Sequence, residues 1–172
     1  MMHRPAVGYV LGATVAMLVV AGVPGAAQKS SDLSGKWAFA KAKSQGVPSV
    51  PRIFNSTGAP AGSEELLITQ TPAAVSIQIG GVALVYRVDG TEGNISADGR
   101  AGFPVGKATW EDGKLVATLV QEVFSAAKGD YVKVPLKEVY SLSDGALMLE
   151  RTRTHIDGKT TSEKLVYTKA TS

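Results

Sequence analysis

The stretch of sequence that decides the fold is residues 105–123, VGKATWEDGKLVATLVQEV. Apolar and polar residues alternate in it on both sides of Asp112-Gly113, and this alternation is typical of half-buried β-strands. An Asp-Gly pair tolerates the positive φ angles that a tight hairpin turn needs. We therefore expect a β-hairpin here, with strands at 105–111 and 114–123.

Similar hairpin signals recur along the rest of the chain. Four more Asp-Gly pairs and the pair Gly80-Gly81 mark turns, and short alternating stretches lie between them. We expect further strands at 36–42, 65–70, 74–79, 82–88, 131–142, 146–155 and 160–169. Strands joined by short turns pair antiparallel with their neighbours along the chain, and closing such a meander removes its unpaired edges. The expected fold is all-β, an antiparallel up-and-down meander that closes into a small barrel of eight to ten strands, with an open sheet or a sandwich as the alternative.

Residues 1–27 have the pattern of a signal peptide. Arg4 precedes an uncharged, apolar stretch at 6–23, and Gly25-Ala26-Ala27 then supplies the small side chains that a signal peptidase accepts. We expect cleavage after Ala27, a periplasmic or secreted protein, and a single domain at 28–172. The alternative is an uncleaved anchor, through which the protein would contact a membrane.

Composition excludes several classes of function. The chain has no cysteine, so it has neither disulfides nor a thiol for catalysis or metal binding. Cleavage would leave 17 basic and 15 acidic residues, and the basic ones are scattered, so we expect no nucleic-acid partner. The expected domain has a single histidine, His155, and no phosphate-binding loop, so we expect no metal and no cofactor.

The connection at 44–63 is much longer than the others. It contains three prolines and three glycines, and loops of this length are either functional lids or disordered segments. The adjacent large apolar residues Ile53 and Phe54 favour a lid that plugs the mouth of a barrel. The proline, glycine and serine content favours a disordered insertion instead, and both interpretations stay open.

Three short motifs resemble the lipocalin and wider calycin pattern. Ser34-Gly35-Lys36-Trp37 resembles the Gly-x-Trp that opens the first strand of that family, and Gly129-Asp130-Tyr131 resembles a second motif, with Gly where Thr is usual. Arg151 or Arg153 resembles a basic residue on a late strand. The resemblance implies a barrel in which Gly35 and Trp37 are structural, with Trp37 closing the floor beneath one of the two arginines. It implies a fold and no particular ligand.

A second resemblance covers nearly all of the expected domain. The chain is similar to a group of small, uncharacterised exported bacterial proteins, whose motifs correspond here to Ile68-Thr69-Gln70, Tyr86 to Gly90, Trp110 to Leu115, Ser141 to Gly145 and Tyr167 to Lys169. This similarity implies the fold and the compartment. It implies no activity.

Strand alternation places two arginines on an apolar face. If Leu147 and Leu149 point into the core, the same period carries Arg151 and Arg153 to the same side. A buried, unpaired arginine is costly. Either the strand leaves the core there, or the arginines meet an anionic partner, or one of them stacks on Trp37 as the resemblance implies.

The sequence contains no recognisable catalytic constellation. Four glutamates lie on expected strands, where two could face each other as in a glycosidase, but each has a basic neighbour and we expect all four to be solvated. These are Glu122, Glu138, Glu150 and Glu163. We therefore expect a protein that is not an enzyme.

The combined features favour a binding protein. We expect an extracytoplasmic, monomeric, lipocalin-like module for a small hydrophobic or amphiphilic ligand, because an eight- to ten-stranded barrel holds one small molecule or fills with side chains. The alternative is a protein-interaction module with a packed barrel, and a small-barrel enzyme is the third choice. The expected ligand contacts are Ile53, Phe54, Tyr86, Trp110, Tyr140 and Arg151.

Overall fold

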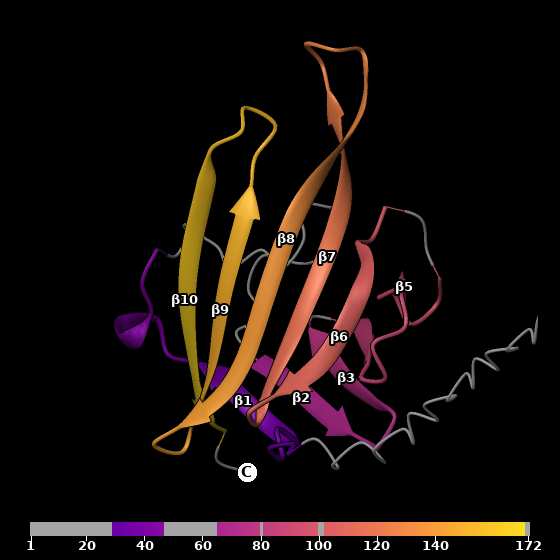
Figure 1. Cartoon of the computed structure of the whole chain (residues 1–172). Helices are drawn as coiled ribbons and strands as arrows, with labels where there is room; N and C mark the ends of the chain where they lie inside the picture. Colours follow the sequence, from indigo (N-terminus) through magenta and orange to yellow (C-terminus); the bar gives the residue numbers. More distant parts are fainter. Residues whose placement is uncertain (1–28, 47–64, 80, 100–101, 171–172) are drawn as a thin grey trace, which may run out of the picture.

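The computed structural model describes residues 29–46, 65–79, 81–99 and 102–170 (Figure 1). The expected signal peptide at 1–27 and most of the long connection at 44–63 lie outside these residues. The described part is all-β, as expected, with one short 3-10 helix, η1 (Lys41–Lys43). The strands are β1 (Gly35–Phe39), β2 (Glu65–Gln70), β3 (Ala74–Ile79), β4 (Val82–Arg87), β5 (Gly93–Asn94), β6 (Val105–Glu111), β7 (Lys114–Ser125), β8 (Asp130–Ser143), β9 (Ala146–Thr154) and β10 (Thr160–Lys169).

All ten strands belong to one antiparallel sheet that curls into a nearly closed barrel. Neighbours along the chain pair with each other, and β1 also pairs with β10, which gives the order β4-β3-β2-β1-β10-β9-β8-β7-β6-β5. The two ends of this order meet after β5, where Leu84 forms a bridge with Ser96 and the Val85 amide donates to the Ile95 carbonyl at 2.8 Å. The predicted barrel architecture is therefore confirmed.

Two of the Asp-Gly pairs form the tight turns that the sequence predicted. Asp112 and Gly113 have φ angles of 49° and 80° between β6 and β7, and Asp144 and Gly145 have angles of 51° and 72° between β8 and β9. Positive φ at both central residues is the geometry that matches the twist of paired strands. The nine predicted strands agree with the observed ones to within a few residues at each end, and β5 alone was not predicted.

Trp37 closes one end of the barrel. Its side chain is 1% exposed, and its ring N–H donates to the Leu33 carbonyl at 2.9 Å. The Lys169 ammonium lies over its ring, 4.1 Å from the ring centroid, in the position where the resemblance implies one of the two arginines. Gly35 begins β1 with a φ of 131°, a conformation that a side chain would strain.

The hairpin of β7 and β8 extends beyond the rest of the barrel (Figure 1). β6 pairs with β7 only as far as Val120, and β9 pairs with β8 only from Leu136 onward. Pro135 is the first β8 residue past the end of β9, where its missing N–H costs no bond to that strand. The residues beyond these points pair only with each other and form a two-stranded ribbon, defined here as 121–134.

Candidate functional site

A charged row crosses the apolar interior of the barrel. Cross-strand pairing aligns Ala117 of β7 with Glu138 of β8, Glu138 with Arg151 of β9, and Arg151 with Glu163 of β10. Ala108 of β6 lies next in the same row. Two alanines therefore stand where larger side chains would fill the barrel, and this leaves room for the long glutamate and arginine side chains.

Arg151 is the centre of this row. Its side chain is 2% exposed, and its Nε donates to Oε1 of Glu138, which is fully buried, at 2.8 Å. Its Nη1 lies 3.4 Å from Oε2 of Glu163, whose side chain is 20% exposed. One buried guanidinium thus joins two carboxylates from the strands on either side.

Two tyrosine hydroxyls complete the shell of Glu138. The Tyr86 hydroxyl, from β4 on the opposite wall, donates to Oε2 of Glu138 at 2.8 Å, and the Tyr140 hydroxyl lies 3.3 Å from the same oxygen. The two rings make an edge-to-face contact with centroids 5.8 Å apart. Glu138 therefore accepts bonds at both carboxylate oxygens, which a fully buried carboxylate requires.

The electrostatics of this cluster are strongly coupled. Burial opposes the charged form of Arg151, but its interactions with Glu138, Tyr140 and Glu163 together outweigh burial and raise the pKa of the guanidinium above its usual value. Burial, followed by the negative charge of Glu138, raises the pKa of Tyr86 and of Tyr140 well above the ordinary tyrosine range. The geometry and these directions describe an ion pair with two neutral phenols.

Arg153 lies one interior row further from Trp37. It pairs across the sheet with Leu136 and Thr161. Its Nη2 is buried and has no hydrogen-bond partner among the described residues. Burial, and then repulsion from Arg151, lowers the pKa of this guanidinium. Arg153 is therefore a cation in an environment that disfavours its charge.

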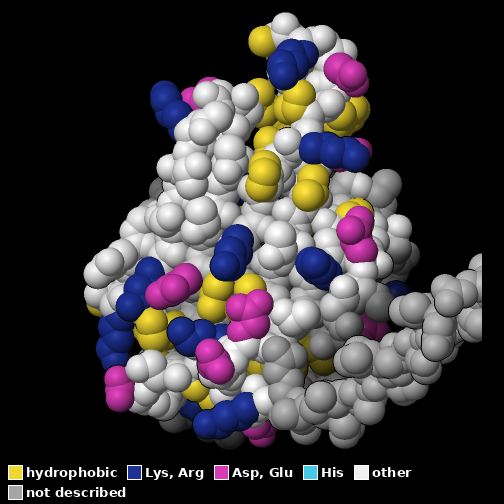
Figure 2. All heavy atoms as spheres, in the orientation of Figure 1, with side chains coloured by type: hydrophobic (Ala, Val, Ile, Leu, Met, Phe, Trp, Pro, Cys, Tyr) yellow, Lys and Arg dark blue, Asp and Glu magenta, His cyan; other side chains and the backbone are white. Residues whose placement is uncertain are grey.

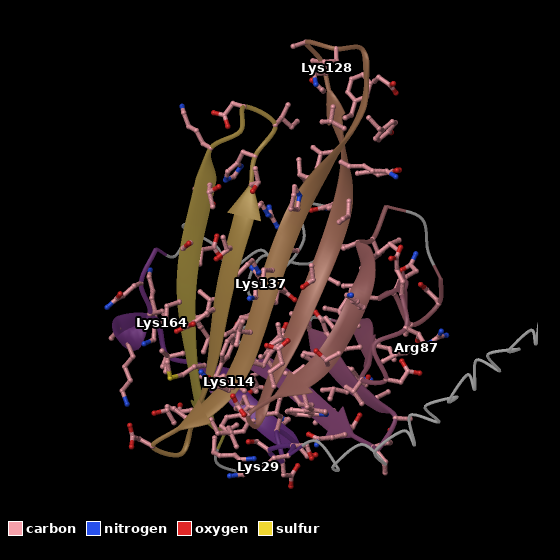
Figure 3. All side chains as sticks on the ribbon, viewed as in Figure 1. Lys29, Arg87, Lys114, Lys128, Lys137 and Lys164 are labelled. Carbon is pink, nitrogen blue, oxygen red and sulfur yellow. The ribbon has the colours of Figure 1, made fainter. Side chains whose placement is uncertain are left out.

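A cleft of about 430 Å³, lined by Arg151 and other polar residues, lies over β9 and β10. Alternation along the two strands places four of its lining residues on the outer face of the barrel, including Lys164, which Figure 3 labels. The lining residues are Gln45, Gly46, Glu150, Arg151, Thr152, Ser162, Glu163 and Lys164. Among the described residues, none that lines this cleft has an apolar side chain, so this part of the cleft differs from the apolar site that a hydrophobic ligand needs.

The structure brings together three of the predicted ligand contacts. Tyr86, Tyr140 and Arg151 all belong to the cluster around Glu138. Trp110 is 6% exposed and lies in the interior row that contains Tyr140, separated from it by Leu115. Gly35 and Trp37 lie at the closed end, and Ile53 and Phe54 lie outside the described residues.

The prediction that all four strand glutamates are solvated is wrong for Glu138. It is fully buried and Glu163 is half-buried, whereas Glu122 and Glu150 are exposed. The signal was present in the sequence, because Glu138 stands two residues from each of Leu136 and Tyr140 and must share their face of the strand. The neighbouring Lys137, which is exposed, favoured the incorrect prediction that Glu138 is solvated as well.

The parts of the chain that the structure describes contain no cluster of three or more histidine, aspartate or glutamate side chains that could hold a metal ion. Within the same parts, no helix is long and apolar enough to span a membrane. The sequence matches no protein-family model and no curated protein at a significant level.

Proposed function

We propose that this protein is an extracytoplasmic binding protein of the lipocalin-like type, which holds one small amphiphilic ligand inside its barrel. The observation that carries the proposal is Arg153, an inward-facing arginine with a buried Nη2 that lacks an acceptor among the described residues. A buried donor without an acceptor costs free energy, so its presence favours a role outside folding. An anionic or carbonyl group on a ligand would supply the missing acceptor.

The surroundings of Arg153 favour an amphiphilic ligand over a purely hydrophobic one. Leu119 and Leu136 lie in the same interior row and Val134 lies in the next, and all three are buried apolar side chains. Below this row, the carboxylates of Glu138 and Glu163 are already engaged by Arg151. Arg153 is therefore the cation that a ligand's polar group would meet first, and the apolar part of the ligand would lie against the leucines.

Native mass spectrometry of the exported protein tests the proposal directly. We expect the protein to retain a small molecule after gentle purification. We also expect anilinonaphthalene sulfonate, an amphiphilic anion, to bind with enhanced fluorescence and to be displaced by that molecule. A bare protein mass together with no response from the probe would refute ligand binding, and a retained protein partner would favour the interaction module instead.

Arg153→Met tests whether Arg153 contacts the bound probe. A hydrogen bond to a charged group contributes about 1.5–3 kcal/mol, so we expect the probe's affinity to fall roughly ten- to hundredfold. Arg87→Met removes an exposed arginine of β4 and should leave the affinity unchanged. Because the charge of Arg153 is disfavoured in the folded protein, Arg153→Met should keep or raise stability. Equal binding by both variants would exclude Arg153 from the site.

A further inference from the structure

An apolar patch lies on the outer face of the β7–β8 ribbon and of the three strands at its base. Phe124 stands opposite Tyr131, and Val120 stands between Val105 and Pro135 in a row of three strands. Phe124 and Tyr131 are 55% and 65% exposed, and their ring centroids lie 5.5 Å apart. Figure 2 shows hydrophobic side chains gathered on the upper part of this face of the molecule. We call these five residues the ribbon patch.

The barrel core does not account for the ribbon patch. The inward-facing residues of the ribbon, such as Gln121 and Val134, are each only 5% exposed, whereas the patch residues face away from the core. Taking about 200 Å² for each ring, Phe124 and Tyr131 together leave roughly 240 Å² of surface in water. Single exposed apolar residues are ordinary on a protein surface, but two adjoining aromatic rings that are this exposed form an apolar patch, and such patches are often functional.

Lysines surround the ribbon patch. Lys128 lies at the turn of the ribbon and Lys137 lies below it on β8, as labelled in Figure 3. Lys133 stands opposite Glu122 between the two apolar rows, and Lys107 shares the row below with Lys137. The same region contains two acidic residues, Glu122 and Asp130. The four lysines outnumber them, so the surface around the patch carries a net positive charge.

We propose that the ribbon patch docks on an anionic lipid surface. Aromatic rings are favoured at the boundary between lipid headgroups and acyl chains, and lysines at the rim are attracted to anionic headgroups. The ribbon is the part of the described structure that projects furthest from the barrel, so its rings can enter a bilayer interface before the body of the protein touches it (Figure 1). Its turn begins with the small residues Ala126 and Ala127, which offer little resistance to entry.

A fluorophore on the ribbon tests this docking in the full-length chain. Because the chain has no cysteine, Ala126→Cys provides a single attachment point for a polarity-sensitive nitrobenzoxadiazole group. We expect its emission to shift to the blue with vesicles of phosphatidylcholine and phosphatidylglycerol, and the shift to weaken as salt is added. The same label at Ser143→Cys, at the opposite end of β8, should not shift. Since each label reports only its own surroundings, membrane contact by residues 1–27 would not mimic this result.

Two pairs of substitutions test whether the ribbon patch is the part of the surface that binds the vesicle. Phe124→Ser with Tyr131→Ser should weaken the vesicle affinity at least tenfold, whereas Leu67→Ser with Leu142→Ser, which removes two other exposed leucines, should leave it unchanged. Three results would each overturn the proposal: no shift on any vesicle, an equal shift on phosphatidylcholine alone, or the same affinity for both double variants. A shift that appears only with soluble envelope proteins would also overturn it and would identify the patch as a protein interface.

Discussion

Arg151→Met tests whether the barrel depends on its buried ion pair. The substitution keeps a side chain of similar length but leaves the carboxylate of Glu138 fully buried without its guanidinium. Breaking a buried pair from one side costs about 3–5 kcal/mol. With a urea m-value of about 2 kcal/mol/M, the unfolding midpoint should fall by roughly 1.5–2.5 M.

The second arm of this experiment removes both charges. In Arg151→Met with Glu138→Gln, the amide oxygen still accepts from the Tyr86 and Tyr140 hydroxyls, and the only carboxylate that loses its partner is that of Glu163, which is partly exposed to water. Replacing both members of a buried pair is often nearly neutral, so we expect the double variant to recover most of the lost stability.

Both variants are measured by urea unfolding. The fluorescence of Trp37 and Trp110 reports unfolding, because both rings are buried in the native barrel. A loss below about 1 kcal/mol for Arg151→Met would contradict the reasoning. So would a double variant that loses as much stability as Arg151→Met alone.

Three further predictions concern stability. Burial raises the pKa of Tyr167 to about 12, above the ordinary value of 10, so the contribution of the neutral phenol to stability is complete below pH 10 and is lost as the pH rises toward 12. The urea midpoint should therefore fall less steeply across this pH range in Tyr167→Phe than in the unchanged protein. Parallel plots of midpoint against pH for the two proteins would contradict this. Gly35→Ala places a side chain at a φ of 131° and should cost about 1–3 kcal/mol, which an unchanged urea midpoint would exclude. Phe124→Ser with Tyr131→Ser should lower the free energy of unfolding by no more than about 1.5 kcal/mol, because the exposed rings mainly contact each other; a larger loss measured by the same method would assign them a structural role.

Much of the barrel could be predicted because its local signals agree with its global pairing. Asp112-Gly113 and Asp144-Gly145 form two-residue turns, and such turns fix both the pairing partner and the register of the strands that they join. β5 (Gly93–Asn94) was missed because two residues are too few to show an alternation. Its role in closing the sheet arises from contacts with β4 that no local pattern encodes.

The candidate site was only partly predictable. Strand parity correctly placed Arg151 on the inner face, and of the alternatives left open for it the structure shows an anionic partner, supplied by the protein's own Glu138 and Glu163. Identifying those partners requires the register between β8, β9 and β10, which fixes which side chains share a row. The cation over Trp37 could not be assigned in advance, because Lys169 reaches it through the pairing of the first strand with the last.

The projection of the ribbon likewise follows from register. Its length depends on where β6 and β9 stop pairing with the hairpin, at Val120 and Leu136. The sequence of the hairpin itself alternates without a break across these positions, so it gives no sign that the neighbouring strands end there.

The position of β10 between β1 and β9 has a consequence for how the chain folds. β10 is the only described strand that joins the half made by β1 to β4 to the half made by β5 to β9, apart from the bridge after β5. Its contacts span great separations in sequence: the Lys169 ammonium bonds the Ser34 carbonyl, 135 positions away. Pairings of such high contact order form slowly, because a long loop must close before any contact offsets its entropy. Both halves therefore keep an open edge until β10 pairs, and a chain in which β10 is not yet free to pair cannot complete its core.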